Sequence, residues 1–365
     1  AEVAALRYPE GGPTRPQDAD ATFRAKDGFE VSLVAAEPLI RNPISIDWDN
    51  RGRMWVACTP GYPYKEKFSG IPARDQILIL EDTDGDGTMD ERKVFYEGLD
   101  LVTSLVRHRD GVIVSASPQI LFLRDTDGDD VADTVEALYE GFGYGDTHAV
   151  LSNLRWGPDG WIYATHGFNN TSHFKARDGS TLDLNSGNVF RFQPDGSRVE
   201  IWSRGQVNPF GLCFDRRGNL YSADCHSSPI YQLLRGAFYP SFGKPHDGIG
   251  FGPAMIQHTH GSTGICGIVY FDRGVWGTKW NDHILIGNPV TSRVNRDRIE
   301  FVGSTPLAVE QPDFVTSDDP WFRPVDLCLG GDGALYVADF YNRIIGHYEV
   351  PLDHPGRDRK RGRIW

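Results

Sequence analysis

The hydrophobic and polar positions of this chain repeat one pattern along its length. Each copy has a short apolar run, a polar turn built around glycine, and a second apolar run that holds Trp or Tyr in its clearest copies. Clear copies occupy residues 43–57, 154–165, 209–223 and 324–338, a fainter copy 103–115 and a distorted one 267–286. Short apolar runs joined by glycine turns predict β-hairpins. No stretch has the periodicity of an amphipathic helix, so the pattern predicts an all-β protein.

The spacing of the copies predicts the architecture. The turn glycines follow one another at intervals of 59, 49, 58 and 115 residues at Gly52, Gly111, Gly160, Gly218 and Gly333. The last interval is two repeats long, and the distorted copy fills it. A strand-rich repeat of this length is typical of a β-propeller, and six copies predict a six-bladed one.

Both ends of the chain are expected to take part in closing the ring. A blade with an unpaired edge strand is prone to aggregation, so a propeller is usually completed by a strand from the opposite terminus. Residues 29–35 read as that strand, and we expect them to complete the last blade. This predicts an extended N-terminal arm over 1–28 and one propeller domain over 29–365, with an insertion at 234–262 that covers the functional face.

Composition excludes several classes of function. The net charge of −13 repels phosphate backbones, so we expect no nucleic acid partner. No apolar run approaches the roughly 18–20 residues of a membrane span. The five cysteines form no Cys-x-x-Cys motif, and we expect them to be small core residues. No signal peptide is visible in the chain, but calcium-type loops suit a calcium-rich compartment, so we expect a periplasmic or secreted protein.

Two Asp-rich loops follow the spacing of a calcium loop. In 82–90 the sequence Asp-x-Asp-x-Asp-Gly-x-x-Asp places carboxylates around a turn that glycine permits, and 125–133 repeats it with Asp130 in place of that glycine. The alternative is a solvated turn without an ion. Because the loops join outer strands, a calcium ion there would be structural. The predicted ligands are Asp82, Asp84, Asp86, Asp90, Asp125, Asp127, Asp129 and Asp133.

The repeat register places a second set of polar residues close to the axis. His148, Asn208 and Arg323 precede first strands of their blades, whereas His166 and His226 follow second strands. Imidazoles can act as bases at neutral pH or bind a transition metal, and a guanidinium can hold an oxyanion. His260 joins this set from the motif His-Thr-His-Gly-Ser-Thr-Gly at 258–264. For each residue the alternative is an ordinary structural role.

At these residues the chain resembles the soluble quinoprotein glucose/sorbosone dehydrogenases, six-bladed propellers that bind pyrroloquinoline quinone (PQQ). The stretch 148–163 resembles the segment that begins with the catalytic histidine of that family. Residues 208–212 and 323–326 resemble segments that carry cofactor contacts. The resemblance implies that His148 removes the proton of a substrate hydroxyl while hydride passes to the quinone, with Arg323 as an electrostatic clamp.

The chain is also similar to a propeller family of membrane-bound-dehydrogenase type from planctomycetes and verrucomicrobia. The likeness rests on the Asp-Thr-Asp-Gly-Asp-Gly hairpin, His-Gly-Ser-Thr-Gly at 260–264, Phe-Arg-Pro-Val-Asp at 322–326, Asp-Phe-Tyr-Asn at 339–342 and the terminal Gly-Arg-Ile-aromatic. Members often continue into a cytochrome c domain, which implies a separate cytochrome c as electron acceptor here.

Three functions remain open at this point. The first is oxidation of a small carbohydrate, an aldose or polyol, with PQQ and calcium; His148, Arg323 and His260 are the expected catalytic residues, and Asn208, His226, Arg323 and His166 the expected cofactor contacts. The second is a metal-dependent carbohydrate hydrolase or lyase in which His148, His226 and His260 gather around a transition metal. The third is a carbohydrate-binding propeller without catalysis.

Overall fold

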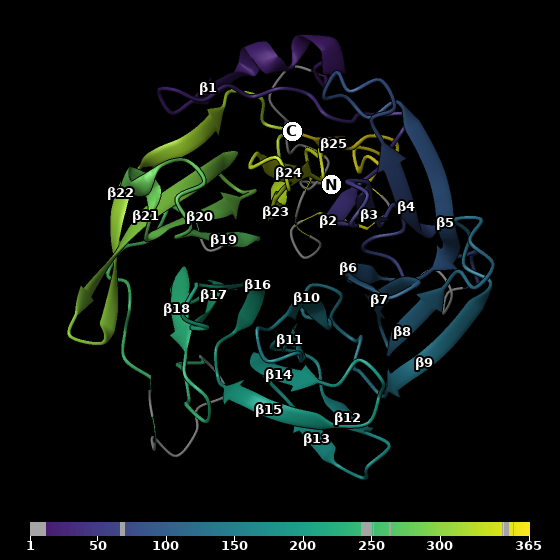
Figure 1. The fold of residues 1–365 in the computed structure, drawn as a ribbon, viewed down its shortest axis with the longest axis vertical. Coiled ribbons are helices and arrows are strands. Elements are labelled where there is room, and N and C mark those ends of the chain that lie inside the picture. The colour runs from purple at the N-terminus through teal and green to yellow at the C-terminus, as the bar shows by residue number, and fades with distance from the viewer. Residues whose placement is uncertain are drawn as a thin grey trace.

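The strands form a ring of six antiparallel sheets around a central axis (Figure 1), which confirms the predicted all-β, six-bladed propeller. The computed structural model of the protein describes residues 12–65, 70–241, 250, 252–262, 264–344, 346, 350–352 and 354–365. In each sheet the strands follow one another outward from the axis in chain order, except that β1 lies outermost in the fifth sheet. None of the described residues forms a helix long and apolar enough to cross a membrane.

The first two blades are regular four-stranded meanders. The first contains β2 (Pro43–Trp48), β3 (Met54–Cys58), β4 (Asp75–Glu81) and β5 (Glu91–Leu99). The second contains β6 (Val102–His108), β7 (Gly111–Ala116), β8 (Gln119–Arg124) and β9 (Thr134–Glu140). The apolar side chains of the two sheets pack face to face in one buried cluster, because stacked blades bury the alternate apolar positions of each strand.

The third and fourth blades depart from this plan. The third has β10 (Ser152–Trp156), β11 (Ile162–His166), β14 (Asn188–Phe192) and β15 (Val199–Arg204), with the separate hairpin β12 (Ser172–Lys175) and β13 (Thr181–Leu184) outside it (Figure 1). Within the described residues, the fourth has β16 (Asn208–Phe214), β17 (Leu220–Cys225) and β18 (Ile230–Leu233). Of the predicted insertion at 234–262, residues 242–249 and 251 lie outside the described residues.

The fifth blade is the widest sheet. It contains β19 (Ile268–Phe271), β20 (His283–Asn288), β21 (Arg293–Val302) and β22 (Thr305–Ser317), and β1 (Phe23–Ala25) pairs with the outer side of β22. Short 3-10 helices precede β1 and β20, at η2 (Pro16–Asp18), η3 (Asp20–Thr22) and η5 (Thr278–Trp280). Residues 16–25, predicted within an extended arm, therefore lie against the ring. The boundary at residue 28 stays a prediction.

The last blade closes the ring with both termini, although not by the strand expected at 29–35. Its sheet contains β23 (Pro324–Leu329), β24 (Leu335–Asp339) and β25 (Arg363–Ile364), so its third strand is the C-terminus. The N-terminal segment reaches β25 only at its end, where Val34 and Ala35 donate backbone hydrogen bonds to Ile364. Residues 29–33 instead run as irregular chain, and Phe29 packs on Trp276, Trp280 and Phe314 of the fifth blade.

The turn glycines used to count blades have two physical origins. Gly52, Gly160, Gly218 and Gly333 adopt the left-handed conformation that most side chains disfavour. Gly111 does not; a Cβ there would lie 1.9 Å from the Leu123 carbonyl oxygen of the neighbouring strand. The same sequence signal thus marks four turns and one close backbone approach.

Candidate functional site

A cavity of about 230 Å³ lies where all six blades meet. Its wall is formed by the starts of first strands and by the loops that follow second strands, which are the positions singled out by the repeat register. Most of the wall is apolar, with Ile44, Val150, Phe210, Val325 and Phe340 among the lining residues. The polar lining residues are Thr59, Thr103, Thr147, His148, Ser152, Asn208, His226, Arg323, Asn342, Arg357 and Asp358. Four of the predicted site residues therefore share one cavity: His148, Asn208, His226 and Arg323.

His148 lies on the loop that leads into β10 of the third blade. Its side chain is 29% exposed, and its Nδ1 lies 3.9 Å from Oδ1 of Asp146. The same carboxylate oxygen accepts the His148 backbone N–H at 3.0 Å, and the ring meets Tyr62 edge-on at 5.6 Å. A carboxylate beside an imidazole favours its protonated form, so Asp146 suits a His148 that accepts a proton.

Asn170 fixes the loop that carries His148. Its side chain is buried, its Nδ2 donates to the carbonyl oxygens of Asp146 and Ala149, and its Oδ1 accepts the Asp146 N–H. The sequence analysis missed both Asp146 and Asn170. The two positions are 24 residues apart, and only the folding of the β12–β13 hairpin region onto the loop brings them together.

Asn208 and His226 face the cavity from the fourth blade. Asn208 Oδ1 accepts the Phe168 backbone N–H at 2.8 Å, which leaves the Nδ2 group as a donor with no hydrogen bond to the described residues. His226 is exposed and has φ = 79°, a left-handed conformation that is uncommon for a side chain of this size. Asp224 holds the strand start through the N–H groups of Val207 and Asn208, and burial raises its pKa to about 7.

Arg323 is buried in the wall, and its guanidinium is already engaged. Nε donates to the carbonyl of Asn342, Nη1 to Pro289, Phe322 and the Ser292 hydroxyl, and Nη2 to Arg343. These bonds bridge two loops, which was the structural alternative named for this residue. Burial and the neighbouring Arg343 lower its pKa to about 10, so the group remains charged at neutral pH. Arg323 is thus a fixed positive charge rather than a freely moving clamp.

Two predicted site residues do not line the axial cavity. His166 is fully buried, and its ring nitrogens lie 2.9 Å from the Ser186 carbonyl oxygen and 2.7 Å from the Ser172 hydroxyl, so it is a satisfied core histidine. His260 lies on the fifth blade, with Nε2 2.7 Å from Oδ2 of Asp297. Among the described residues, the side chains that lie close enough to share a metal ion with His260 are His258 and Asp297, not His148 and His226. The predicted metal centre of His148, His226 and His260 is therefore not formed. The repeat register aligned the backbone positions of these residues, but the neighbouring strands decide where each imidazole lies.

In both Asp loops the first aspartate accepts backbone N–H groups of the turn, and both loops lie on outer hairpins. Asp82 accepts the N–H groups of Gly85, Asp86 and Gly87, and Asp125 accepts those of Gly128 and Asp130. Carboxylate oxygens gather within 4.8 Å of one another in two groups of three, Asp82, Asp84, Asp86 and Asp125, Asp127, Asp133. Asp90 accepts the Thr83 hydroxyl and lies outside these groups, whereas the equivalent Asp133, which accepts the Thr126 hydroxyl, belongs to one of them. Asp129 accepts the Val131 N–H and belongs to neither group.

Asp130, which replaces the turn glycine of the second loop, has a partner outside the loop. It takes the left-handed conformation with φ = 67°. Both of its oxygens accept from Nη1 of Arg53 at 2.8 Å, and one accepts from Lys93 at 2.6 Å. Burial opposes ionisation, but these two cations outweigh it and lower the pKa of Asp130. Ion pairs with the first blade thus stabilise a left-handed backbone at the position where the first loop has glycine.

The five cysteines are free, and two of them, Cys225 and Cys266, line the axial cavity. Burial raises the pKa of Cys225 to about 12 and that of Cys266 well above its ordinary value. Neither thiol is therefore a nucleophile at neutral pH.

Comparison with known structures shows the same propeller fold in proteins of low sequence identity. The PQQ-bound aldose sugar dehydrogenase of Streptomyces coelicolor superimposes with a TM-score of 0.63 at 15% identity, over 94% of this chain and 96% of that one. The PQQ domain of pyranose dehydrogenase from Coprinopsis cinerea gives 0.59 at 13% identity, over 94% and 96%. The apo soluble aldose sugar dehydrogenase of Escherichia coli gives 0.53 at 14%, over 90% and 98%. No curated protein matches the chain in sequence.

The sequence itself assigns the family. Residues 15–365 match the model of DUF7133, a domain of unknown function, and the chain belongs to that family. The match covers the propeller and the segment that packs on its fifth blade.

The side chains that line the cavity have the chemistry to hold an anionic planar cofactor. The described residues that line it supply two guanidiniums, two imidazoles and two carboxamides, but one carboxylate, Asp358, which is itself paired with Arg361. Asn208 Nδ2 remains a donor without a partner in the described part of the chain, and apolar walls can cover the faces of a ring system. Asn208 and His226 can donate hydrogen bonds into the cavity, and Arg323 adds a fixed positive charge to its wall.

Proposed function

We propose that the axial cavity is the active site of a dehydrogenase that oxidises a hydroxyl group of a small carbohydrate, with His148 as the base. The observation that carries this proposal is that His148, Asn208, His226 and Arg323, from three blades, line one cavity. The fold is shared with aldose sugar dehydrogenases of known structure, and this likeness supports the reaction class without supplying residue roles.

His148 would accept the hydroxyl proton, and the neighbouring Asp146 would stabilise the imidazolium that results. Removal of that proton makes the carbon-bound hydrogen a better hydride donor. PQQ, when bound, supplies the two-electron acceptor for this hydride. Asn208, His226 and Arg323 would hold an anionic cofactor, and the apolar wall would exclude water from the reacting carbon.

Further proposals follow from the sequence resemblance. A soluble cytochrome c fits the role of final electron acceptor, and a periplasmic or secreted location fits both that partner and the Asp loops. We also propose, from the same resemblance, a relationship to the propellers of membrane-bound-dehydrogenase type from planctomycetes and verrucomicrobia. Calcium is proposed at the two groups of three aspartates. It would be structural there, because each loop is joined to a neighbouring segment: the Met89 N–H donates to the Val34 carbonyl, and the Ala132 N–H donates to the Phe95 carbonyl of the first blade.

The second candidate, a hydrolase or lyase at a three-histidine centre, has no support from geometry, since the structure separates His260 from His148 and His226. The direct test is reconstitution. The purified chain should bind PQQ at micromolar concentration and then reduce a redox dye with an aldose.

The variant His148→Gln should lose turnover by at least about 100-fold while it still binds PQQ, because a positioned base contributes roughly 10²–10⁴. His173→Ala, which alters an exposed imidazole of the β12–β13 hairpin, serves as the control. Failure of the wild type to bind PQQ, or full activity of His148→Gln, would contradict the proposal.

A further inference from the structure

A second polar cluster lies on the fifth blade, away from the axial cavity. It joins Asp297, in the middle of β21, to His258 and His260 on the segment that precedes β19. That segment is attached to the blade: the Met255 carbonyl accepts the Ala308 N–H at 2.8 Å. Met255 also packs in an apolar cluster with Ile284 and Ile299. The two histidines are therefore held by packed backbone rather than by a free loop.

The three side chains converge through specific atoms. Asp297 is fully buried, and each of its carboxylate oxygens faces one imidazole: Oδ1 lies 2.8 Å from Nε2 of His258, and Oδ2 lies 2.7 Å from Nε2 of His260. The His258 side chain is 21% exposed and that of His260 is 1% exposed. The two rings stand edge to face with centroids 4.9 Å apart.

Hydrogen bonding does not account for this arrangement. His260 and Asp297 form a hydrogen bond, but His258 Nε2 and Asp297 Oδ1, although close, make no hydrogen bond to each other or to any other described group, and both atoms are buried. No Lys or Arg in the described part of the chain pairs with Asp297. A buried carboxylate oxygen and a buried imidazole nitrogen without partners cost free energy, whereas two ligand atoms that face one metal ion have this geometry.

We propose that His258, His260 and Asp297 bind a divalent first-row transition metal ion, with Zn²⁺ as the ion that best fits two imidazole nitrogens and one carboxylate. Imidazole ligands favour such ions over Ca²⁺ and Mg²⁺, which take oxygen ligands. The site therefore differs in chemistry from the two Asp loops.

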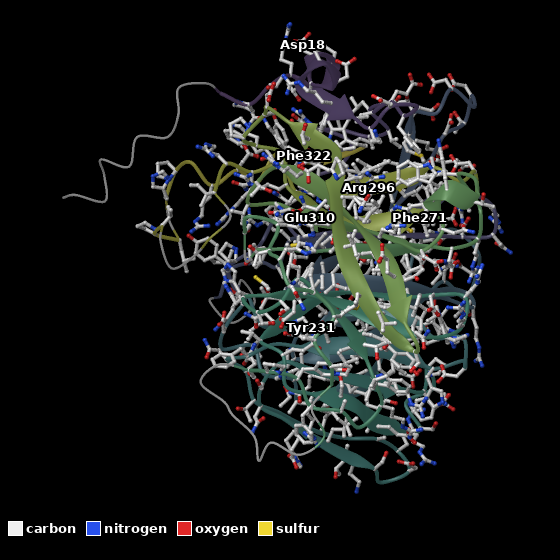
Figure 2. The ribbon with its side chains drawn as sticks, turned by 90° about the vertical axis from the view of Figure 1, so that its left-hand side faces the viewer. Asp18, Tyr231, Phe271, Arg296, Glu310 and Phe322 are labelled. Carbon is white, nitrogen blue, oxygen red and sulfur yellow. The ribbon has the colours of Figure 1, made fainter. Side chains whose placement is uncertain are left out.

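The surroundings of the cluster match a metal site with an open position. Glu310 of β22 places Oε1 3.6 Å from Nδ1 of His260, the outer carboxylate that commonly orients a metal-bound histidine. A cleft beside His260 is lined by Arg293, Asn295, Glu310 and Asp313. In Figure 2 the outer strands of this blade face the viewer, and the labelled Glu310 and Arg296 lie on them. Three protein ligands leave room for a water molecule from this cleft.

The test is metal binding, independent of dehydrogenase activity. Chelator-treated full-length protein is titrated with Zn²⁺ alone by calorimetry in the presence of millimolar Ca²⁺, which saturates oxygen-ligand sites. The wild type should bind one Zn²⁺ per chain at this site. His258→Ala should weaken that affinity at least 100-fold. His173→Ala, which disrupts a His–Asp pair on the surface between His173 and Asp183, should change it less than twofold.

A second measurement needs no substitution. X-ray absorption of the Zn²⁺-loaded wild type should show two imidazoles and oxygen ligands. A first shell without imidazole, absence of stoichiometric Zn²⁺ binding, or equal affinity of His258→Ala and wild type would overturn the proposal.

Discussion

Arg155 of the third blade and Asp326 of the sixth join opposite sides of the propeller, with Nη2 2.8 Å from Oδ1. Arg155 also donates to the Leu212 carbonyl of the fourth blade, and Asp326 accepts the Ile46 N–H of the first. Four of the six blades thus meet at one ion pair. A propeller has no single continuous core, so an ion pair across the axis couples blades whose sheets do not pack against each other.

Removal of one partner of this ion pair should strongly destabilise the fold. Arg155→Met leaves Asp326 largely buried without its cation, and we expect a loss of about 3–5 kcal/mol in the free energy of unfolding, measured by urea denaturation. The matched control is Arg124→Met at the exposed pair with Asp110, where solvent screening makes the expected loss much smaller. Equal losses in the two variants would show that the central pair does not couple the blades.

The loop that carries His148 should depend on Asn170 for its conformation. Asn170→Ala removes three hydrogen bonds to residues 146–149, so we expect a lower kcat in the reconstituted dye assay, with a smaller loss than in His148→Gln. Asn169→Ala, which removes one exposed contact to Asp146, is the comparison. If Asn170→Ala changes only the melting temperature and leaves kcat intact, Asn170 is a structural residue alone.

Buried Asp224 should make stability depend on pH. Its pKa is raised by burial from 3.8 to about 7 in the folded chain. Its contribution to the free energy of unfolding is therefore full below about pH 4 and is lost as the pH rises through about 7. Between these values the free energy of unfolding should fall by up to about 1.4 kcal/mol per pH unit from this group.

Asp224→Asn should flatten that slope in urea denaturation from pH 5 to pH 8. Its amide can still accept the Val207 and Asn208 N–H groups and donate to Ser227. Asp27→Asn, at a fully exposed carboxylate, should leave the slope as in the wild type. An unchanged slope in Asp224→Asn would assign the pH dependence to other groups.

Calcium removal should destabilise the outer edges of the first two blades. Repulsion from Asp129 and the other carboxylates raises the pKa of Asp127, and a bound cation would relieve it. We expect two Ca²⁺ ions per chain by calorimetry, a lower melting temperature in chelator, and one ion in Asp127→Ala. Identical melting curves with and without chelator would contradict calcium at these loops.

Local sequence determined much of this protein. The blade count followed from turns and strands whose alternation lies within about 15 residues, and the Asp loops could be predicted because every hydrogen bond within them is local. The register also placed His148, Asn208, His226 and Arg323 near the axis, since equivalent positions of different blades must converge there.

Tertiary structure decided what the side chains do. Arg323 is engaged by the Pro289 carbonyl 34 residues earlier in the chain, His166 by serines that fold over it, and His260 by Asp297 on a strand 37 residues away. Ring closure at Val34 and Ala35 likewise required the C-terminal strand. Strand periodicity and turn chemistry act between neighbours in sequence and can be read there, but the partner of a buried charge is chosen by packing between segments that only the closed ring brings together.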